Sequence, residues 1–141
     1  MGLDGSMATP RSEAIRVLLI EDSAVLAERL REMLLQMPGV DLVGMAGSEK
    51  EAVALLARTP ADALILDLHL SQGNGFGVIG AMRTLGTSAE VVILTNYTLP
   101  QYQRRAQALG VHYFLDKARE FDSISDVLQE IAGRRDRPRA N

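Results

Sequence analysis

Apolar residues follow two patterns along this chain: short continuous runs, and longer stretches in which every third or fourth residue is apolar. A continuous run indicates a strand buried on both faces, and the 3,4 spacing indicates an amphipathic helix. Strands and helices are therefore predicted to alternate five times. The predicted strands are Arg16–Ile20, Val40–Ala46, Ala63–Asp67, Val91–Thr95 and His112–Leu115.

The predicted helices have sequence signals at their ends. Pro38-Gly39 stops the first helix, and Gly133 is predicted to close the last. Ser48 and Glu51 have the spacing of a capping box, in which each side chain satisfies a backbone N–H of the other residue. The predicted helices are Ser23–Met37, Ser48–Thr59, Phe76–Leu85, Leu99–Leu109 and Phe121–Ile131.

The alternation of strands and helices indicates an α/β fold. Parallel strands need crossover connections, which are right-handed, so helices are expected on both faces of the sheet. For five strands and five helices, precedent gives the flavodoxin-like doubly wound sheet with strand order 2-1-3-4-5. In this order the first and third strands are neighbours at the switch point, and sites form there at the carboxyl ends of the strands.

Polar side chains stand at the carboxyl ends of four predicted strands. Glu21 and Asp22 follow the first strand, and Asp67 ends the third, before a glycine-rich turn. Three neighbouring carboxylates cannot all stay ionised without a cation, and hard oxygen ligands select Mg²⁺ or Mn²⁺. One carboxylate is then free to attack phosphorus. Thr95 and Lys117, at the ends of two further strands, are suited to bind phosphoryl oxygens.

Composition and charge narrow the function classes. A chain of 141 residues suits one domain, and the absence of cysteine fits a cytoplasmic protein. The apolar runs are too short to cross a membrane. The four arginines and one aspartate of residues 134–141 contribute +3 to the net charge of −3, which leaves −6 for the rest. An acidic body disfavours nucleic-acid binding by the domain itself.

Three segments are predicted. Residues 1–13 are a disordered leader, and Met1–Ser6 before Met7 resembles part of an expression tag. Residues 14–133 form the folded domain, and residues 134–141 form a basic tail.

The strand-end motifs resemble those of a known family, the receiver domain of bacterial two-component response regulators. The resemblance covers residues 15–133. It rests on the acidic pair Glu21-Asp22, the segment Asp67–Gly75, the strand end Leu94-Thr95 and the pair Asp116-Lys117, which occur in this order and each close a strand.

The resemblance assigns roles to these residues. It implies that Asp67 accepts the phosphoryl group, that Asp22 and Asp67 ligate Mg²⁺, and that Glu21 acts through metal-bound water. The backbone carbonyl of His69 completes the protein ligands. Further implied roles are the switch hydroxyl (Thr95), the phosphate-pairing lysine (Lys117), the switch aromatic (Phe114), and control of access to the phosphoryl group (His69, Asn96 and Tyr97).

The resemblance also implies partners. A sensor histidine kinase or a phosphotransfer protein donates the phosphoryl group, and the domain is a switch rather than an enzyme, with only slow loss of its own phosphoryl group. A homodimer is expected through the face formed by Leu99–Leu109, His112–Leu115 and Phe121–Ile131. The chain departs from the family pattern at Ser71 and Ala118, where proline is usual.

Other interpretations of these residues stay open at this point. A degenerate receiver would act as a phosphorylation-independent binding module, and a haloacid-dehalogenase-type phosphatase would need a second aspartate where His69 stands. Glu21 and Asp22 could cap a helix, Asp67 a turn, and Phe114 could be plain core. Thr95 and Lys117 have structural or surface alternatives. The chain is either a complete single-domain regulator or a receiver cut from a transcription factor.

Overall fold

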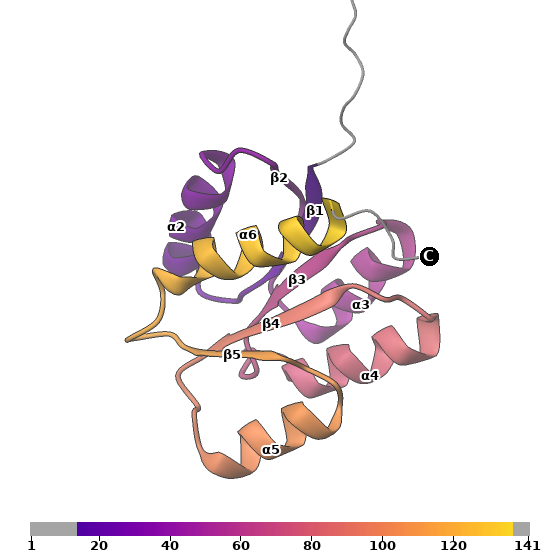
Figure 1. Ribbon diagram of the computed structural model, residues 1–141. Helices are drawn as coiled ribbons and strands as arrows, with labels where there is room; N and C mark the ends of the chain where they lie inside the picture. Colours follow the sequence, from indigo (N-terminus) through magenta and orange to yellow (C-terminus); the bar gives the residue numbers. More distant parts are fainter. Residues whose placement is uncertain (1–13, 137–141) are drawn as a thin grey trace, which may run out of the picture.

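The structure is a computed structural model that describes residues 14–136. Five parallel strands form one sheet in the order β2-β1-β3-β4-β5, which confirms the predicted fold class and strand order (Figure 1). The strands are β1 (Ile15–Ile20), β2 (Val40–Ala46), β3 (Ala63–Leu66), β4 (Glu90–Thr95) and β5 (Tyr113–Asp116). The helices are α2 (Ala24–Leu35), α3 (Glu49–Arg58), α4 (Gly75–Leu85), α5 (Pro100–Ala108) and α6 (Ser123–Asp136).

Helices cover both faces of the sheet and create two cores. Side chains of α2 and α6 pack with one set of strand residues, and those of α3, α4 and α5 pack with the other set. Successive residues of β1 point to opposite faces, so Leu18 lies in the second core and Leu19 in the first. Both residues are fully buried. This double coverage explains why the central strands are continuously apolar in the sequence.

The N-termini of α2 and α3 are capped by serines. The Ser23 hydroxyl accepts a hydrogen bond from Leu26 N–H at 3.3 Å. The Ser48 hydroxyl accepts one from Glu51 N–H at 3.2 Å, but the Glu51 carboxylate accepts from Gly47 N–H at 2.9 Å. The predicted capping box is therefore only partly right. Ser48 caps the helix as predicted, but the Glu51 carboxylate accepts from the N–H of Gly47 and not from that of Ser48.

The last helix is longer than predicted. It continues through Gly133 to Asp136, because Gly133 does not take the left-handed conformation that ends helices. Residues 134–136 of the predicted tail are thus helical, and residues 137–141 and the predicted leader lie outside the described part of the chain. No helix among residues 14–136 has the length and apolar character needed to cross a bilayer.

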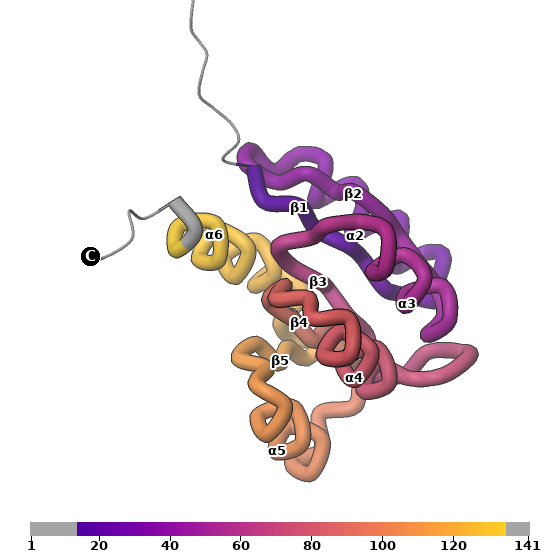
Figure 2. The backbone as a smooth tube through the Cα atoms, turned by 90° about the vertical axis from the view of Figure 1, so that its right-hand side faces the viewer, coloured from indigo at the N-terminus to yellow at the C-terminus, as the bar shows by residue number. Residues whose placement is uncertain are grey.

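Helix α5 lies at the β5 edge of the sheet, at the end farthest from β2 (Figure 1 and Figure 2). It starts with Pro100 and has no side-chain cap, and Ala106 is its only buried residue. The Arg105 guanidinium lies 4.2 Å from the centre of the Phe76 ring of α4, and the Tyr102 ring lies 6.3 Å from it. Contacts with the Phe76 ring thus add to the burial of Ala106 in attaching α5 to the core.

Substitution of two leucines of α2 should separate core from surface. Leu30 is fully buried, whereas Leu35 is 58% exposed. Leu30→Ala should lower the free energy of unfolding by about 2–5 kcal/mol, because it leaves a cavity in the core under α2 and α6. Leu35→Ala should change it by less than about 0.5 kcal/mol. Urea unfolding of both variants measures the difference, and equal effects would contradict the described packing of α2.

Candidate functional site

Backbone hydrogen bonds position the site by extending the sheet just beyond its strands. Asp67 N–H donates to the Ile20 carbonyl at 3.1 Å, which fixes Asp67 at the end of β3 beside β1. Lys117 N–H donates to the Thr95 carbonyl at 2.9 Å and fixes Lys117 beside the end of β4. The carboxyl ends of four strands therefore bring the predicted residues to one edge of the sheet.

Lys117 forms ion pairs with two buried carboxylates. Its Nζ lies 2.7 Å from Asp67 Oδ2 and 3.0 Å from Glu21 Oε1. The side chains are 12%, 5% and 2% exposed for Lys117, Asp67 and Glu21. The interpretation of Lys117 as a surface charge is therefore wrong: its ammonium supplies positive charge inside the site.

Burial and charge shift the pKa values of two groups in the site, Lys117 and Glu21. Burial alone would lower the pKa of Lys117, but the hydrogen bonds to Asp67 and Glu21 outweigh it, so the pKa lies above its usual value. Burial raises the pKa of Glu21, against the opposing effects of Ser23 N–H and Lys117. Because this pKa is raised, the contribution of Glu21 to stability is full below its unfolded pKa and is lost as pH rises through the folded value. A further positive charge beside Glu21 would therefore stabilise its ionised form.

The carboxylates of Glu21, Asp22 and Asp67 form a cluster that fits a divalent cation. One oxygen of each lies within 4.8 Å of the others. Asp22 is exposed, and its carboxylate accepts no hydrogen bond from residues 14–136. Carboxylate oxygens are hard ligands of the kind that suits Mg²⁺ or Mn²⁺. The predicted carboxylate ligands are thus together, with one of them open to solvent.

The helix-capping interpretation of the two acids is only partly right. Ser23, not Asp22, caps α2. Glu21 Oε2 does accept a hydrogen bond from Ser23 N–H at 3.0 Å, so Glu21 holds the start of α2 while its other oxygen faces Lys117. Asp22 has no such structural task in the described part of the chain.

Thr95 and Phe114 lie on neighbouring strands. Thr95 is fully buried, and its hydroxyl accepts a hydrogen bond from Tyr97 N–H at 3.2 Å. Phe114 pairs with Ile93 across β4 and β5, is half-buried, and packs against the core of α3, α4 and α5. Phe114 therefore has a core contact, and its predicted switch role stays a prediction.

The residues predicted to control access surround the strand ends. His69 N–H donates to Asp67 Oδ1 at 3.2 Å, and the His69 and Tyr97 rings lie 4.8 Å apart between centres, tilted by 39°. Tyr97 is 43% exposed. Asn96 is exposed and lines a cleft of about 330 Å³ together with Lys117. The three side chains thus lie around the Asp67 and Lys117 end of the site.

The two departures at usual proline positions, Ser71 and Ala118, have different settings. The peptide bond between Lys117 and Ala118 is trans, as are all the others among residues 14–136. Ser71 is exposed in the loop between Asp67 and α4.

The loop between Asp67 and α4 contacts Glu49 of α3, whose carboxylate accepts a hydrogen bond from Asn74 N–H at 3.0 Å. This contact was not predicted from the sequence, where its only signal is an acid at the start of one helix followed by glycines near the start of the next.

Comparisons with known proteins agree with this geometry. A sequence profile of the response regulator receiver domain matches residues 17–129. The chain is 28% identical over 122 residues to the uncharacterized transcriptional regulatory protein YvfU of Bacillus subtilis, with 86% of this chain and 61% of that protein covered. It is 32% identical over 128 residues to the transcriptional regulatory protein PdtaR of Mycobacterium tuberculosis, with 91% and 58% covered. The chain thus spans about 60% of the length of these two relatives.

A solved structure shows the same fold. The receiver domain of the Francisella response regulator 1452 superposes with a TM-score of 0.77, at 19% identity, over 86% of this chain and 98% of that one. With the matched profile, the strand order and the acidic cluster all in agreement, the chain belongs to the family of response regulator receiver domains.

Proposed function

We propose that Asp67 accepts a phosphoryl group from a sensor histidine kinase or a phosphotransfer protein, and that the aspartyl phosphate switches the conformation of this domain. The observation that carries the proposal is the position of Asp67. Its carboxylate lies at a strand end, in contact with the Lys117 ammonium and within 4.8 Å of carboxylate oxygens of Glu21 and Asp22. These are the groups that phosphoryl transfer to an aspartate requires.

The chemistry follows from the contacts of Asp67. One carboxylate oxygen attacks phosphorus, the P–N bond of the donor phosphohistidine breaks, and the electron pair goes to the imidazole nitrogen of the donor. Lys117, already 2.7 Å from Asp67 Oδ2, can pair with a phosphoryl oxygen. When bound, Mg²⁺ neutralises negative charge on the carboxylates and on the phosphoryl oxygens. Asp22 and Asp67, with the His69 carbonyl, are the proposed protein ligands, and Glu21 the proposed partner of metal-bound water.

The switch would begin at Thr95. Its hydroxyl now accepts the Tyr97 N–H, and a turn of this hydroxyl toward a phosphoryl oxygen breaks that bond. The connection between β4 and the weakly capped α5 is thereby released, with Phe114 as the proposed switch aromatic below it. A ligand or modification shifts such an equilibrium only through different contacts in the two states, and Thr95 provides that difference.

The regulated output is a downstream partner or a further domain, and the relatives named as transcriptional regulatory proteins support a role in gene control. A homodimer through the face of α5, β5 and α6 and a cytoplasmic location are parts of the same proposal. The polar surface of α5, which buries only Ala106, leaves this face free for such contacts.

Phosphorylation should be confined to Asp67. Intact mass measured after incubation with acetyl phosphate and Mg²⁺ should show one phosphoryl adduct. The adduct should disappear in Asp67→Asn and persist in Asp41→Asn, which changes an exposed aspartate on β2. An adduct that survives Asp67→Asn would place the phosphoryl group elsewhere. Absence of any adduct in the wild type would favour the degenerate receiver.

Asp22 should serve the metal rather than the fold. Asp22→Ala should abolish phosphorylation and weaken Mg²⁺ binding. Without metal the variant should melt no lower than the wild type, because loss of a like charge relieves repulsion. Ser23→Ala is the matched control: it should lower the free energy of unfolding by about 1 kcal/mol through loss of the cap, with the carboxylates intact. Calorimetry without Mg²⁺ measures both, and a clearly destabilised Asp22→Ala contradicts the assignment.

Tyr97 should slow the loss of the phosphoryl group. Water needs an in-line path to phosphorus, and the proposed role of the Tyr97 and His69 rings, which contact each other, is to flank that path. Tyr97→Ala should therefore release phosphate several-fold faster than the wild type, whereas Tyr97→Phe, which keeps the ring, should release it at the wild-type rate. Phosphate release from purified phosphoprotein measures these rates. An equal or slower rate in Tyr97→Ala would contradict the proposed role of Tyr97 in protecting the phosphoryl group.

A further inference from the structure

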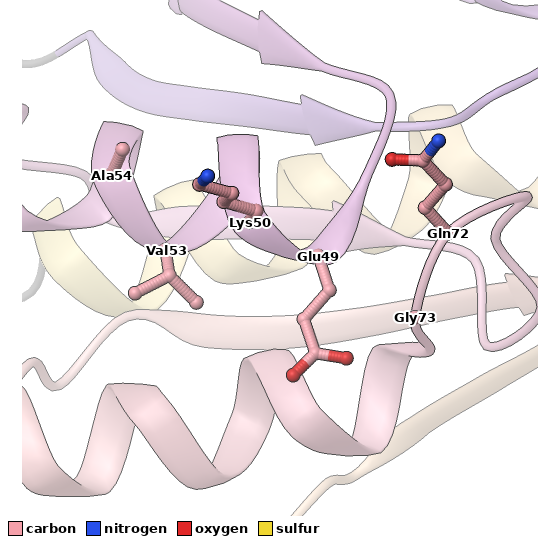
Figure 3. Close-up of a pocket in the computed structure, with 6 residues that line it drawn as sticks. All are labelled: Glu49, Lys50, Val53, Ala54, Gln72 and Gly73. Carbon is pink, nitrogen blue, oxygen red and sulfur yellow. The ribbon is translucent and has the colours of Figure 1, made fainter.

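The carboxylate of Glu49 lies at the first turn of α4, although Glu49 belongs to α3 (Figure 3). Its Oε1 accepts a hydrogen bond from Asn74 N–H at 3.0 Å, and its own N–H donates to the Gln72 carbonyl at 3.0 Å. One residue thus holds the loop on both sides of Gly73. We propose that Glu49 is a positioning residue that fixes the loop carrying His69 for metal binding and phosphoryl transfer, a role that rests on the proposed function of Asp67.

Two glycines make room for this carboxylate. A Cβ atom at Gly73 or at Gly77 would lie less than 3.0 Å from side-chain atoms of Glu49, closer than Cβ atoms lie to such neighbours in proteins. Gly73 also has a φ of +84°, which disfavours other residues. Gly77 lies inside α4, where glycine weakens a helix relative to alanine. The close approach of Glu49 therefore gives a physical reason for glycine at position 77.

Charge favours the same contact. Negative charge near the N-terminus of a helix is stabilising, but α4 has no acidic residue in its first turn. Its cap is the neutral side chain of Asn74, which accepts from Gly77 N–H at 3.0 Å. Glu49 supplies the missing charge from the neighbouring helix, and within residues 14–136 it forms no ion pair that would compete.

The contact is linked to Asp67 through the loop. Asn74, held by Glu49, forms a β-bridge with His69, and Gly75 N–H donates to the Leu68 carbonyl at 2.8 Å. His69 N–H in turn donates to Asp67 Oδ1 at 3.2 Å. A shift of Asn74 therefore moves His69, which orients the Asp67 carboxylate and carries the carbonyl proposed as a metal ligand.

Leu68 and Leu70 anchor the first half of the loop in the core, whereas residues 71–73 are exposed. Gln72 and Gly73 border an open cleft of about 610 Å³, which is also lined by Glu49, Lys50, Val53 and Ala54 of α3 (Figure 3). Ser71 stands where the family resemblance implies proline, so the turn lacks the stiffness of a proline ring. The hydrogen bonds of Glu49 thus supply a restraint that the turn sequence itself does not provide.

Three variants and three measurements test this role. Glu49→Ala should weaken Mg²⁺ binding about tenfold, by analogy with loss of a group that orients a metal ligand, and should slow phosphorylation by acetyl phosphate. In the metal-free protein it should speed amide hydrogen exchange at His69 and Asn74. Glu49→Gln, which keeps an acceptor oxygen, should restore most of the Mg²⁺ affinity, the phosphorylation rate and the slow amide exchange. Glu51→Ala is the matched control, because Glu51 bonds to Gly47 rather than to the loop, and should leave all three unchanged.

Gly77→Ala gives an independent test from the other side of the contact. The new methyl group should displace the Glu49 carboxylate and reproduce the loss of Mg²⁺ affinity, even though alanine favours the helix. In the double variant Glu49→Ala/Gly77→Ala the losses should not add. Wild-type Mg²⁺ affinity and exchange in Glu49→Ala, or additive losses in the double variant, would overturn the role of Glu49. A wild-type protein that binds Mg²⁺ but takes no phosphoryl group would instead defeat the proposed function, while binding and exchange still decide on Glu49.

Discussion

The balance between two buried carboxylates and one buried ammonium is the constraint on which the rest of this structure depends. Glu21 and Asp67 both contact Lys117, and all three side chains are largely shielded from water. Removal of Lys117 would leave two buried carboxylates without a compensating charge, at a cost of about 3–5 kcal/mol. Backbone hydrogen bonds fix Asp67 beside β1 and Lys117 beside β4, and they thereby hold the carboxylates close to the ammonium.

This charge balance is also what a modification of Asp67 would disturb. Lys117 alone cannot neutralise Glu21, Asp22 and Asp67, so the site keeps an excess of negative charge that favours a divalent cation. In the proposed phosphorylated form, phosphoryl oxygens would compete with Glu21 for the same ammonium. Because Thr95 lies beside Lys117 on the next strand, a redistribution of these contacts reaches the start of the β4–α5 connection directly.

Much of the fold and the site could be predicted from the sequence, for identifiable reasons. Burial on both faces makes the central strands continuously apolar, and polar residues at their ends mark the functional edge. The strand order came from precedent, since periodicity does not say which strands are neighbours. Helix ends are encoded less clearly in the sequence. Glycine occurs inside helices as well as at their ends, and α6 continues through Gly133.

Contacts through space were the part that the sequence could not reveal. The second ion pair of Lys117, with Glu21, and the ring contact of His69 with Tyr97 depend on side-chain conformations fixed only in the folded chain. Glu49 and Asn74 are 25 residues apart and belong to no shared periodic pattern. Their contact follows from how α3 and α4 pack, which no local signal encodes.

The fit of Glu49 against two glycines has a consequence for recombination between related domains. A glutamate at position 49 and any side chain at position 73 or 77 compete for the same space. The residue types at the three positions therefore depend on one another, although position 49 lies in α3, position 73 in the loop and position 77 in α4. A chimera that takes α3 from one relative and the following loop from another would separate them, and its crossover point should lie before residue 49 or after residue 77.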